Sequence, residues 1–259
     1  MSNARHCAAH YLFAPGELEV SGPFFLQPHV FLCQGKRHWV ILDAHRDKYL
    51  CVDRRQFEAL GPSLKGWEGA TGAGTCSAAA VPEDAVALAS QLLTLDILSE
   101  RPAPAKDALP TAYPLPTEAI DPDSPARSRR SSYIHAGAFF ASSARASREL
   151  RKQRFQHTVE LVRARKNRNA GRAGPLDFER ARSLVAVFDR LRWFYPRSYL
   201  CLFDSLALVH FLARFQVYPD WVFGVNADPF EAHCWVQAGS VVLNDTVERV
   251  SALTPIMCV

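Results

Sequence analysis

Proline is concentrated in one short stretch of this 259-residue chain, and that stretch limits how the chain can fold. Residues 101–125 hold seven of the 17 prolines and few large apolar side chains. This composition is typical of a semi-extended linker. We therefore expect two modules, residues 1–100 and residues 131–259, joined by a proline-rich linker over residues 101–130.

The overall composition indicates a folded protein. Apolar residues make up 48% of the chain and charged residues 22%, which excludes wholesale disorder. The first residues lack the apolar segment of a secretory signal, and the most apolar stretch, residues 199–218, is too polar to span a bilayer. Seven scattered cysteines without a CxxC pair argue against a disulfide framework or a four-ligand zinc site. We expect a cytoplasmic protein with no metal and no membrane partner.

Positive charge is concentrated in residues 127–172, which hold 13 Lys and Arg against two Glu, a net charge of +11. Such a segment can bind nucleic acid or an acidic peptide. We interpret it as a solvated helical face, because few aromatic residues are interleaved with the basic ones. Nucleic acid is therefore not an expected partner, although DNA binding through the N-terminal module stays an alternative.

The N-terminal module is expected to contain three short strands and two helices. Runs of β-branched and aromatic residues separated by polar turns predict the strands, and capping and proline signals predict the helices. Strands are expected at residues 29–33, 39–43 and 48–53, and helices at residues 54–60 and 82–98. This content and size fit a small winged-helix module within an α+β protein.

The C-terminal module is expected to begin with helices and to end with strands. Asp177 is the expected N-cap of a helix that runs to Arg192. A further helix begins near Ser198 or Tyr199, so that Cys201 falls in its first turn. Further helical spacing covers residues 133–168, and strands are expected at residues 221–225, 232–236 and 241–245.

Cys201 is the candidate nucleophile. Free N–H groups and the positive dipole end of a helix lower the pKa of a thiol there, and they can also stabilise an oxyanion. Asp204 lies one turn further on and would oppose a thiolate if it shared that face. A cysteine at a helix start is more often a buried thiol, so the prediction depends on its partners.

His233 and Asp245 are the expected partners of Cys201. A turn of odd length centred on Gly239 would set His233 opposite Asp245, and we expect this register. Cys201 would then attack, His233 would accept and return the proton, and Asp245 would hold the imidazole tautomer.

Other arrangements of these residues stay open. An even turn at Gly239–Ser240 would instead set Cys234 opposite Asp245. His233 could be a core histidine with satisfied hydrogen bonds, and Asp245 could belong to a turn. We expect Cys234 to be a packing residue on the face opposite His233.

Four motifs closely resemble the lasso-peptide maturation B proteins, over about residues 176–259. They are Cys201-Leu-x-x-Ser-Leu-Ala-Leu208, Gly224-Val225, Pro229-Phe-x-Ala-His-x-Trp-Val236 and Leu243-Asn-Asp245. This family comprises transglutaminase-like, papain-like cysteine peptidases that remove the leader from a lasso precursor peptide. The resemblance implies that Cys201, His233 and Asp245 are the catalytic residues.

The N-terminal module resembles the family's PqqD-like leader-recognition element, a winged helix-turn-helix. In such modules the leader adds as a strand to the third β-strand and contacts the last helix. The resemblance implies that these residues bind the leader, although the apolar ones could equally be core residues: Lys48, Tyr49, Leu50, Cys51, Val52, Leu88 and Leu92.

The resemblance also implies partners, namely the leader of the precursor peptide and an asparagine-synthetase-like macrolactam cyclase that would use ATP. The chain itself has no Gly-x-x-x-x-Gly-Lys-Ser/Thr loop, so no cofactor is expected to bind by a recognisable motif. The expected function is cleavage at the leader–core junction. Two alternatives are a non-catalytic adaptor that presents the precursor and acyl transfer to an amine, as in a transglutaminase.

Overall fold

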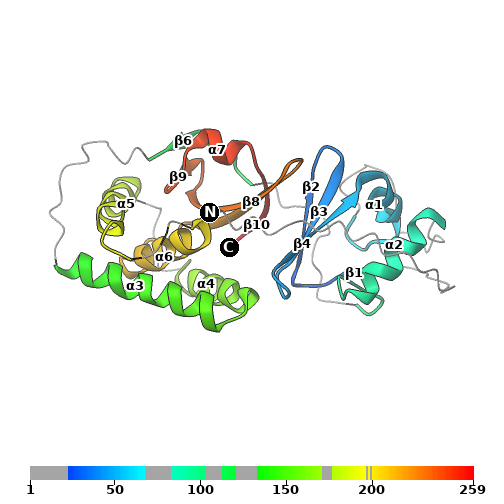
Figure 1. Ribbon diagram of the computed structural model, residues 1–259, viewed down its shortest axis with the longest axis horizontal. Coiled ribbons are helices and arrows are strands. Elements are labelled where there is room, and N and C mark those ends of the chain that lie inside the picture. The colour runs from blue at the N-terminus through cyan, green and yellow to red at the C-terminus, as the bar shows by residue number, and fades with distance from the viewer. Residues whose placement is uncertain are drawn as a thin grey trace. The chain divides into compact units, whose positions relative to one another are not determined.

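A computed structural model shows two units, and each is considered by itself (Figure 1). The first unit comprises residues 1–112 with 225–231, and the second comprises residues 113–224 with 232–259. The structure describes residues 23–67, 83–102, 113–120, 133–170, 177–196, 198 and 200–259. Within these ranges every helix is too short or too polar to cross a bilayer.

The first unit is built on a three-stranded antiparallel sheet in the order β2-β3-β4. Two short strands, β1 and β5, pair antiparallel beside it. The strands are β1 (Phe25–Leu26), β2 (Val30–Gln34), β3 (His38–Asp43), β4 (Lys48–Asp53) and β5 (Leu98–Ser99), and the helices are α1 (Arg54–Leu60), η1 (Gly61–Ser63) and α2 (Glu83–Thr94). The three predicted strands and the first predicted helix are confirmed.

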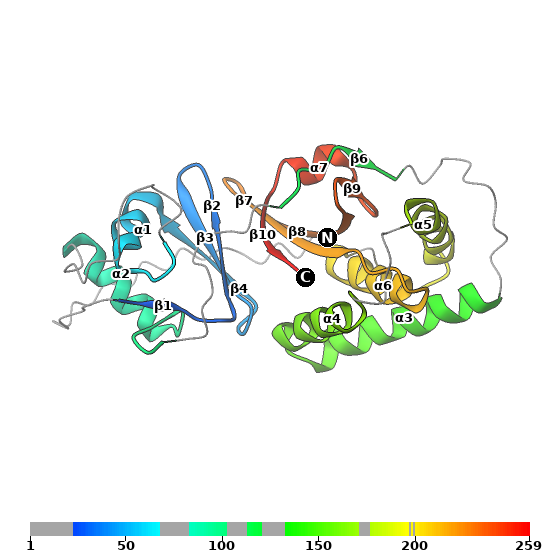
Figure 2. The ribbon, with the colours of Figure 1, turned by 180° about the vertical axis from the view of Figure 1, so that it is seen from behind.

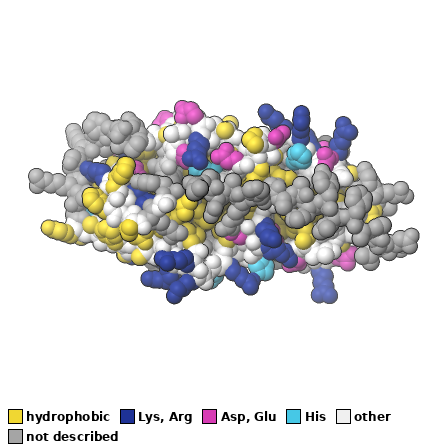
Figure 3. All heavy atoms as spheres, viewed as in Figure 1, with side chains coloured by type: hydrophobic (Ala, Val, Ile, Leu, Met, Phe, Trp, Pro, Cys, Tyr) yellow, Lys and Arg dark blue, Asp and Glu magenta, His cyan; other side chains and the backbone are white. Residues whose placement is uncertain are grey.

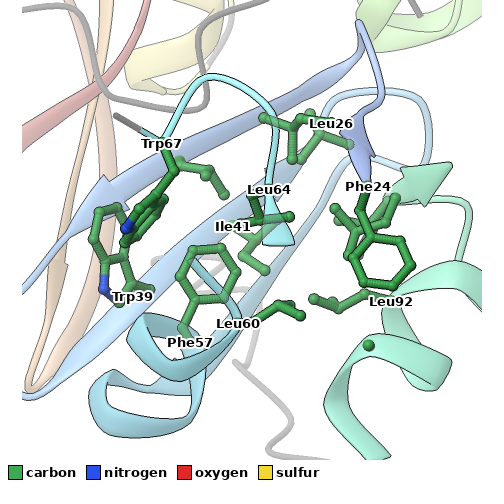
Figure 4. Packing of buried hydrophobic residues seen from close by; sticks show 14 of the residues in the cluster. Phe24, Leu26, Trp39, Ile41, Phe57, Leu60, Leu64, Trp67 and Leu92 are labelled. Carbon is green, nitrogen blue, oxygen red and sulfur yellow. The ribbon is translucent and has the colours of Figure 1, made fainter. Parts of the chain in front are cut away.

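Local sequence accounts for where α1 begins and what it buries. The Asp53 carboxylate accepts hydrogen bonds from the N–H groups of Arg55 and Gln56 at 2.9 and 3.3 Å, which caps the helix. On the buried face, the Phe57 ring lies 5.2 Å from that of Trp39 (Figure 4). Burial of each such side chain contributes about 1.5–3 kcal/mol, and this aromatic cluster anchors α1 to the sheet.

The second predicted helix is shorter than expected. We expected its apolar positions to continue to Leu98, but α2 ends at Thr94 and Leu98 belongs to β5. Asp96 adopts a left-handed conformation with φ of 55°, and the N–H of Ile97 returns to the carbonyl of Leu92 at 2.9 Å. These bonds terminate the helix and turn the chain into the strand.

The second unit contains a five-stranded sheet in the order β10-β7-β8-β9-β6, with helices packed against it (Figure 2). Its strands are β6 (Glu118–Ala119), β7 (Asp220–Ala227), β8 (Phe230–Ala238), β9 (Val241–Val242) and β10 (Thr254–Cys258), of which residues 225–231 of β7, β8 and their turn are assigned to the first unit. Its helices are α3 (Tyr133–Lys152), α4 (Phe155–Ala170), α5 (Phe178–Arg192), α6 (Cys201–Arg214) and α7 (Val247–Ser251). The predicted cap of α5 is present, since Asp177 accepts from the N–H of Arg180 at 3.0 Å.

Part of the predicted linker belongs to the second unit. Within residues 113–120, β6 pairs parallel with β9 and extends the sheet by one strand. The Tyr113 hydroxyl donates to Asp220 at 2.8 Å, which ties the same segment to β7. A two-residue strand such as β6 forms only by pairing with a distant strand. The proline content of the segment alone therefore could not predict it.

Trp235 packs directly on the backbone of Gly224 in the neighbouring strand. A Cβ atom at Gly224 would lie 2.7 Å from the Trp235 ring, closer than side chains pack. Trp235 is buried and its indole N–H donates to Gln237 at 2.8 Å, so the ring cannot move aside without breaking that bond. Glycine is therefore required at this position by space.

The substitution Gly224→Ala should lower the free energy of unfolding by about 1–3 kcal/mol, because it overpacks the contact with Trp235. Gly137→Ala is the matched control, since a Cβ atom there would meet nothing within 4 Å. In the middle of α3 that change should be neutral or slightly stabilising. Thermal and urea unfolding measure both, and equal effects of the two changes would contradict the close contact.

Candidate active site

Cys201 is the first residue of α6, and its side chain is exposed. The preceding Leu200 is extended, with φ of −138°, so the chain turns into the helix at the cysteine. The Asp204 carboxylate accepts from the N–H of Leu200 at 2.8 Å and closes this turn. The nucleophile predicted for the first turn therefore lies at the positive end of a 14-residue helix.

The segment before Cys201 is held by Arg192, which was not among the predicted residues. This side chain is only 3% exposed and donates from Nε to the Asp204 carboxylate. Its two other nitrogens donate at 3.2 Å to the carbonyls of Tyr195 and Ser198. Arg192 thus ties the end of α5, the connecting segment and the start of α6 together.

Arg192 also answers the concern that Asp204 opposes a thiolate at Cys201. Burial raises the pKa of Asp204 and the nearby Cys201 adds to that effect, while the Arg192 guanidinium lowers it. A carboxylate at Asp204 is therefore accompanied by a buried cation, which offsets its repulsion of Cys201.

His233 and Asp245 lie together, with the Nε2 atom of His233 2.5 Å from Oδ2 of Asp245. The other carboxylate oxygen accepts from the N–H of Thr246 at 2.8 Å, which fixes the orientation of the acid. The ring of His233 stacks on Trp235 at 6.2 Å between centroids, so the two share a face as expected. Because Asp245 occupies Nε2, Nδ1 is the ring nitrogen left for Cys201.

The strand register that we expected to join these residues is wrong. Gln237 pairs with Val242 and Ala238 with Val241, which leaves the two-residue turn Gly239–Ser240. Continued to residue 245, this even register would have set Asp245 opposite the neighbour of His233.

Asn244 explains why His233 and Asp245 still meet. The ladder continues to Leu243, whose N–H donates to the carbonyl of Val236 at 2.8 Å. At the next residue the side-chain oxygen of Asn244 accepts from the N–H of Val236 at 2.7 Å, where a strand would use a backbone carbonyl. The backbone leaves the sheet there, and Asp245 is released from the face that the register would assign to it.

The electrostatics of the site favour a charged thiolate and imidazolium pair. The hydrogen bond from Cys234 is the strongest influence on Cys201. With the hydrogen bond and charge of His233, it holds the pKa of this exposed residue well below the usual thiol range, although partial desolvation of the sulfur acts in the opposite direction. Burial lowers the pKa of His233, but hydrogen bonds to Asp245 and Cys201 outweigh this and raise it to about 9. At a pH between the pKa of Cys201 and that of His233, the Cys201 thiol is ionised and the His233 imidazole is protonated.

Cys234 contributes more than the packing we expected. The Ser205 hydroxyl donates to the carbonyl of Cys201 at 2.6 Å and accepts from the Trp221 indole at 2.8 Å. The Ser205 hydroxyl proton is therefore already used in the bond to Cys201. It is not donated to the Cys234 sulfur, although that sulfur lies only 3.4 Å away. Burial and the adjacent Cys201 raise the pKa of Cys234, so it remains a neutral S–H that can donate to the Cys201 thiolate.

The leader-binding residues predicted in the first unit are placed on β4 and α2. β4 is an edge strand of its sheet, and Lys48 is exposed there. Leu92, however, is a core residue with 2% exposure, which favours the alternative that it serves packing. The other predicted residues, Tyr49, Leu50, Cys51, Val52 and Leu88, are half-buried, and their role in binding stays a prediction.

A protein-family model matches most of the second unit. Residues 142–258 match the family model of the transglutaminase-like superfamily. They form a transglutaminase-like domain. The matched span contains Cys201, His233 and Asp245, and its coverage does not reach the N-terminal module. Searches of curated proteins and of solved structures gave no significant match.

The described part of this transglutaminase-like domain, like that of the first unit, brings no three His, Cys, Asp or Glu side chains together in a metal-binding group. Sequence reasoning did not find the roles of Arg192 and Asn244, and it assigned Cys234 only to packing. Cys234 and Asn244 each lie beside a predicted catalytic residue, which is the one signal that could have drawn attention to them.

The thiolate can be measured without a substrate. In the intact protein, iodoacetamide should alkylate Cys201 with a pH midpoint far below 8.5, the usual value for a thiol. Cys234→Val removes the S–H donor at similar volume and should raise that midpoint by about one pH unit or more. Cys258→Ala is the control and should leave it unchanged. Identical midpoints in wild type and Cys234→Val would rule out the hydrogen bond.

Asp245→Asn should lower the pKa of His233 from about 9 toward its ordinary value, because the amide removes the carboxylate charge. An imidazolium is present below its pKa and is lost as the pH rises through it, so the charged pair should disappear at lower pH in the variant. Titration of the histidine ring protons by NMR measures this shift. A His233 pKa unaffected by the change would show that Asp245 does not act on the imidazole.

Proposed function

We propose that this protein is a cysteine peptidase that cleaves a lasso precursor at the junction between leader and core. The observation that carries the proposal is the Cys201 thiol of lowered pKa beside His233, whose Nε2 is held by Asp245. The transglutaminase-like match supports acyl chemistry at such a thiol, which includes both peptide cleavage and acyl transfer.

The first half of the reaction forms a thioester. The Cys201 thiolate attacks the carbonyl carbon of the scissile bond, and the resulting oxyanion accepts hydrogen bonds from N–H groups in the first turn of α6. The imidazolium of His233 gives its proton to the nitrogen of the departing core. The C–N bond breaks, the core leaves with a free amine, and the leader remains bound to Cys201 through its last carbonyl.

The second half releases the leader. Neutral His233 takes a proton from water, and the hydroxide formed attacks the thioester carbonyl. The C–S bond breaks to regenerate the thiolate, and the proton stays on His233 for the next cycle. Asp245 favours the charged imidazole throughout, because it is hydrogen-bonded to the ring.

The first unit would bind the leader. Its sheet ends in β4, and addition of an extended peptide to an edge strand is a common mode of recognition. Binding the leader there would raise the local concentration of the scissile bond at Cys201. An asparagine-synthetase-like cyclase would receive the core, and any use of ATP would belong to that partner.

The test is cleavage of the lasso precursor encoded beside the gene, followed by mass spectrometry. Wild type should produce a single cut at the leader–core junction, and Cys201→Ala should reduce the rate by at least about 10³-fold while still binding the precursor. Cys258→Ala is the matched cysteine control and should cut normally. The reactions are run with and without the cyclase and ATP.

Other outcomes separate the alternatives. Intact precursor bound by wild type in every condition, with an active cyclase control, would favour the adaptor and exclude the peptidase. A product heavier by an added amine, formed only by protein with Cys201, would favour acyl transfer to that amine in place of water.

A further inference from the structure

A cavity of about 180 Å³ lies in the second unit, beside the C-terminal half of α6. It is lined by Ser142, Arg145, Arg165, His210, Ala213 and Arg214. Its volume corresponds to roughly six water molecules, enough for a small polyatomic anion with ordered water. His210 lies nine residues after Cys201, so at 1.5 Å per residue the cavity is about 13 Å further along α6 than the nucleophile.

The charges around this cavity do not balance. His210 accepts at Nδ1 from Arg165 at 2.8 Å, so its Nε2 carries the proton and donates to Glu149 at 2.7 Å. Burial, the largest effect, lowers the pKa of His210, which is consistent with a neutral ring. Glu149, which also binds Arg145 at 2.7 Å, is the one carboxylate that the described part of the chain contributes to this network. Three guanidinium groups, those of Arg145, Arg165 and Arg214, thus face one negative charge.

Two donors at the cavity have no hydrogen-bond partner among the described residues. They are the hydroxyl of Ser142, a residue 1% exposed, and the Nη2 group of Arg165. A buried donor without a partner is destabilising, and native proteins rarely leave one unpaired. Burial and the nearby Arg145 also lower the pKa of Arg165 to about 10, an effect that the charge of Glu149 only partly offsets.

We propose that this cavity binds a phosphate-class oxyanion. Arg165 Nη2 and the Ser142 hydroxyl would donate to its oxygens, and Arg214 would add charge from the exposed side. α3 and α4, which supply Ser142 and Arg165, carry the described part of the basic segment, and Lys and Arg side chains project at the lower left of Figure 3. This binding site is separate from the proposed peptidase chemistry and does not require Cys201.

The experiment compares thermal unfolding of the full chain in phosphate, pyrophosphate and chloride at equal pH and ionic strength, with calorimetric titration of the same anions. Phosphate should raise the unfolding temperature above its value in chloride, because a ligand that binds the native state stabilises it. Ser142→Ala and Arg165→Gln should each weaken phosphate binding about tenfold. Ser143→Ala is the matched control, since its hydroxyl is equally buried and unpaired but does not line the cavity.

Equal stabilisation by phosphate and chloride would overturn the proposal, because it would leave only general screening. Equal losses of phosphate affinity in Ser142→Ala and Ser143→Ala would show that the anion does not bind in this cavity. If Arg165→Gln does not fold, Arg214→Gln changes an exposed side chain and should also weaken binding. Tighter binding of pyrophosphate than of phosphate would support a phosphoryl group on a larger molecule, and the reverse order would support the free ion.

Discussion

Burial of α6 is the constraint on which the second unit depends. Ten of its 14 residues are buried, so the helix needs neighbours on nearly every side. The sheet supplies one and α3 and α5 supply others, with the rings of Phe188 and Phe211 5.5 Å apart between α5 and α6. The two ends of the helix are exposed, Cys201 at its start and Arg214 at its last residue. A helix that is buried along most of its length therefore begins with an accessible thiol. The position of this thiol is set by the sheet and by α3 and α5, which pack against the helix.

Charge pairing makes that thiol usable. Two carboxylates lie close to Cys201, and each would raise its pKa if it were alone. Asp204 is paired with buried Arg192, and Asp245 with His233, so the second pair brings a cation toward the sulfur. Buried ion pairs contribute little to folding stability in general, and removal of one partner is costly. In this domain the two ion pairs set the electrostatic environment of Cys201, and the Arg192–Asp204 pair also fixes the segment that precedes it.

Sequence reasoning was reliable where the decisive interactions are local. The start of α1 follows from Asp53, and the sheet of the first unit follows from its β-branched and aromatic runs between polar turns. Cys201 lies in the first turn of α6 as expected. It was unreliable where the structure depends on contacts between residues that are distant in the sequence. The pairing of β6 depends on β9, more than a hundred residues away, and the position of Asp245 depends on the Asn244 amide. Arg192 left no signal because a helix-terminal arginine usually faces solvent.

The bond from Val236 to Asn244 has a consequence for how sequences of this kind can vary. Leu243 and Asn244 are both pinned to Val236, so Asp245 is positioned from the strand rather than from the Gly239–Ser240 turn. Insertions or deletions in that turn would be absorbed before they reach the acid, and relatives could differ in hairpin length without changing its distance from the histidine. The amide at position 244 should then be retained more strictly than the turn, because it fixes where the backbone leaves the sheet.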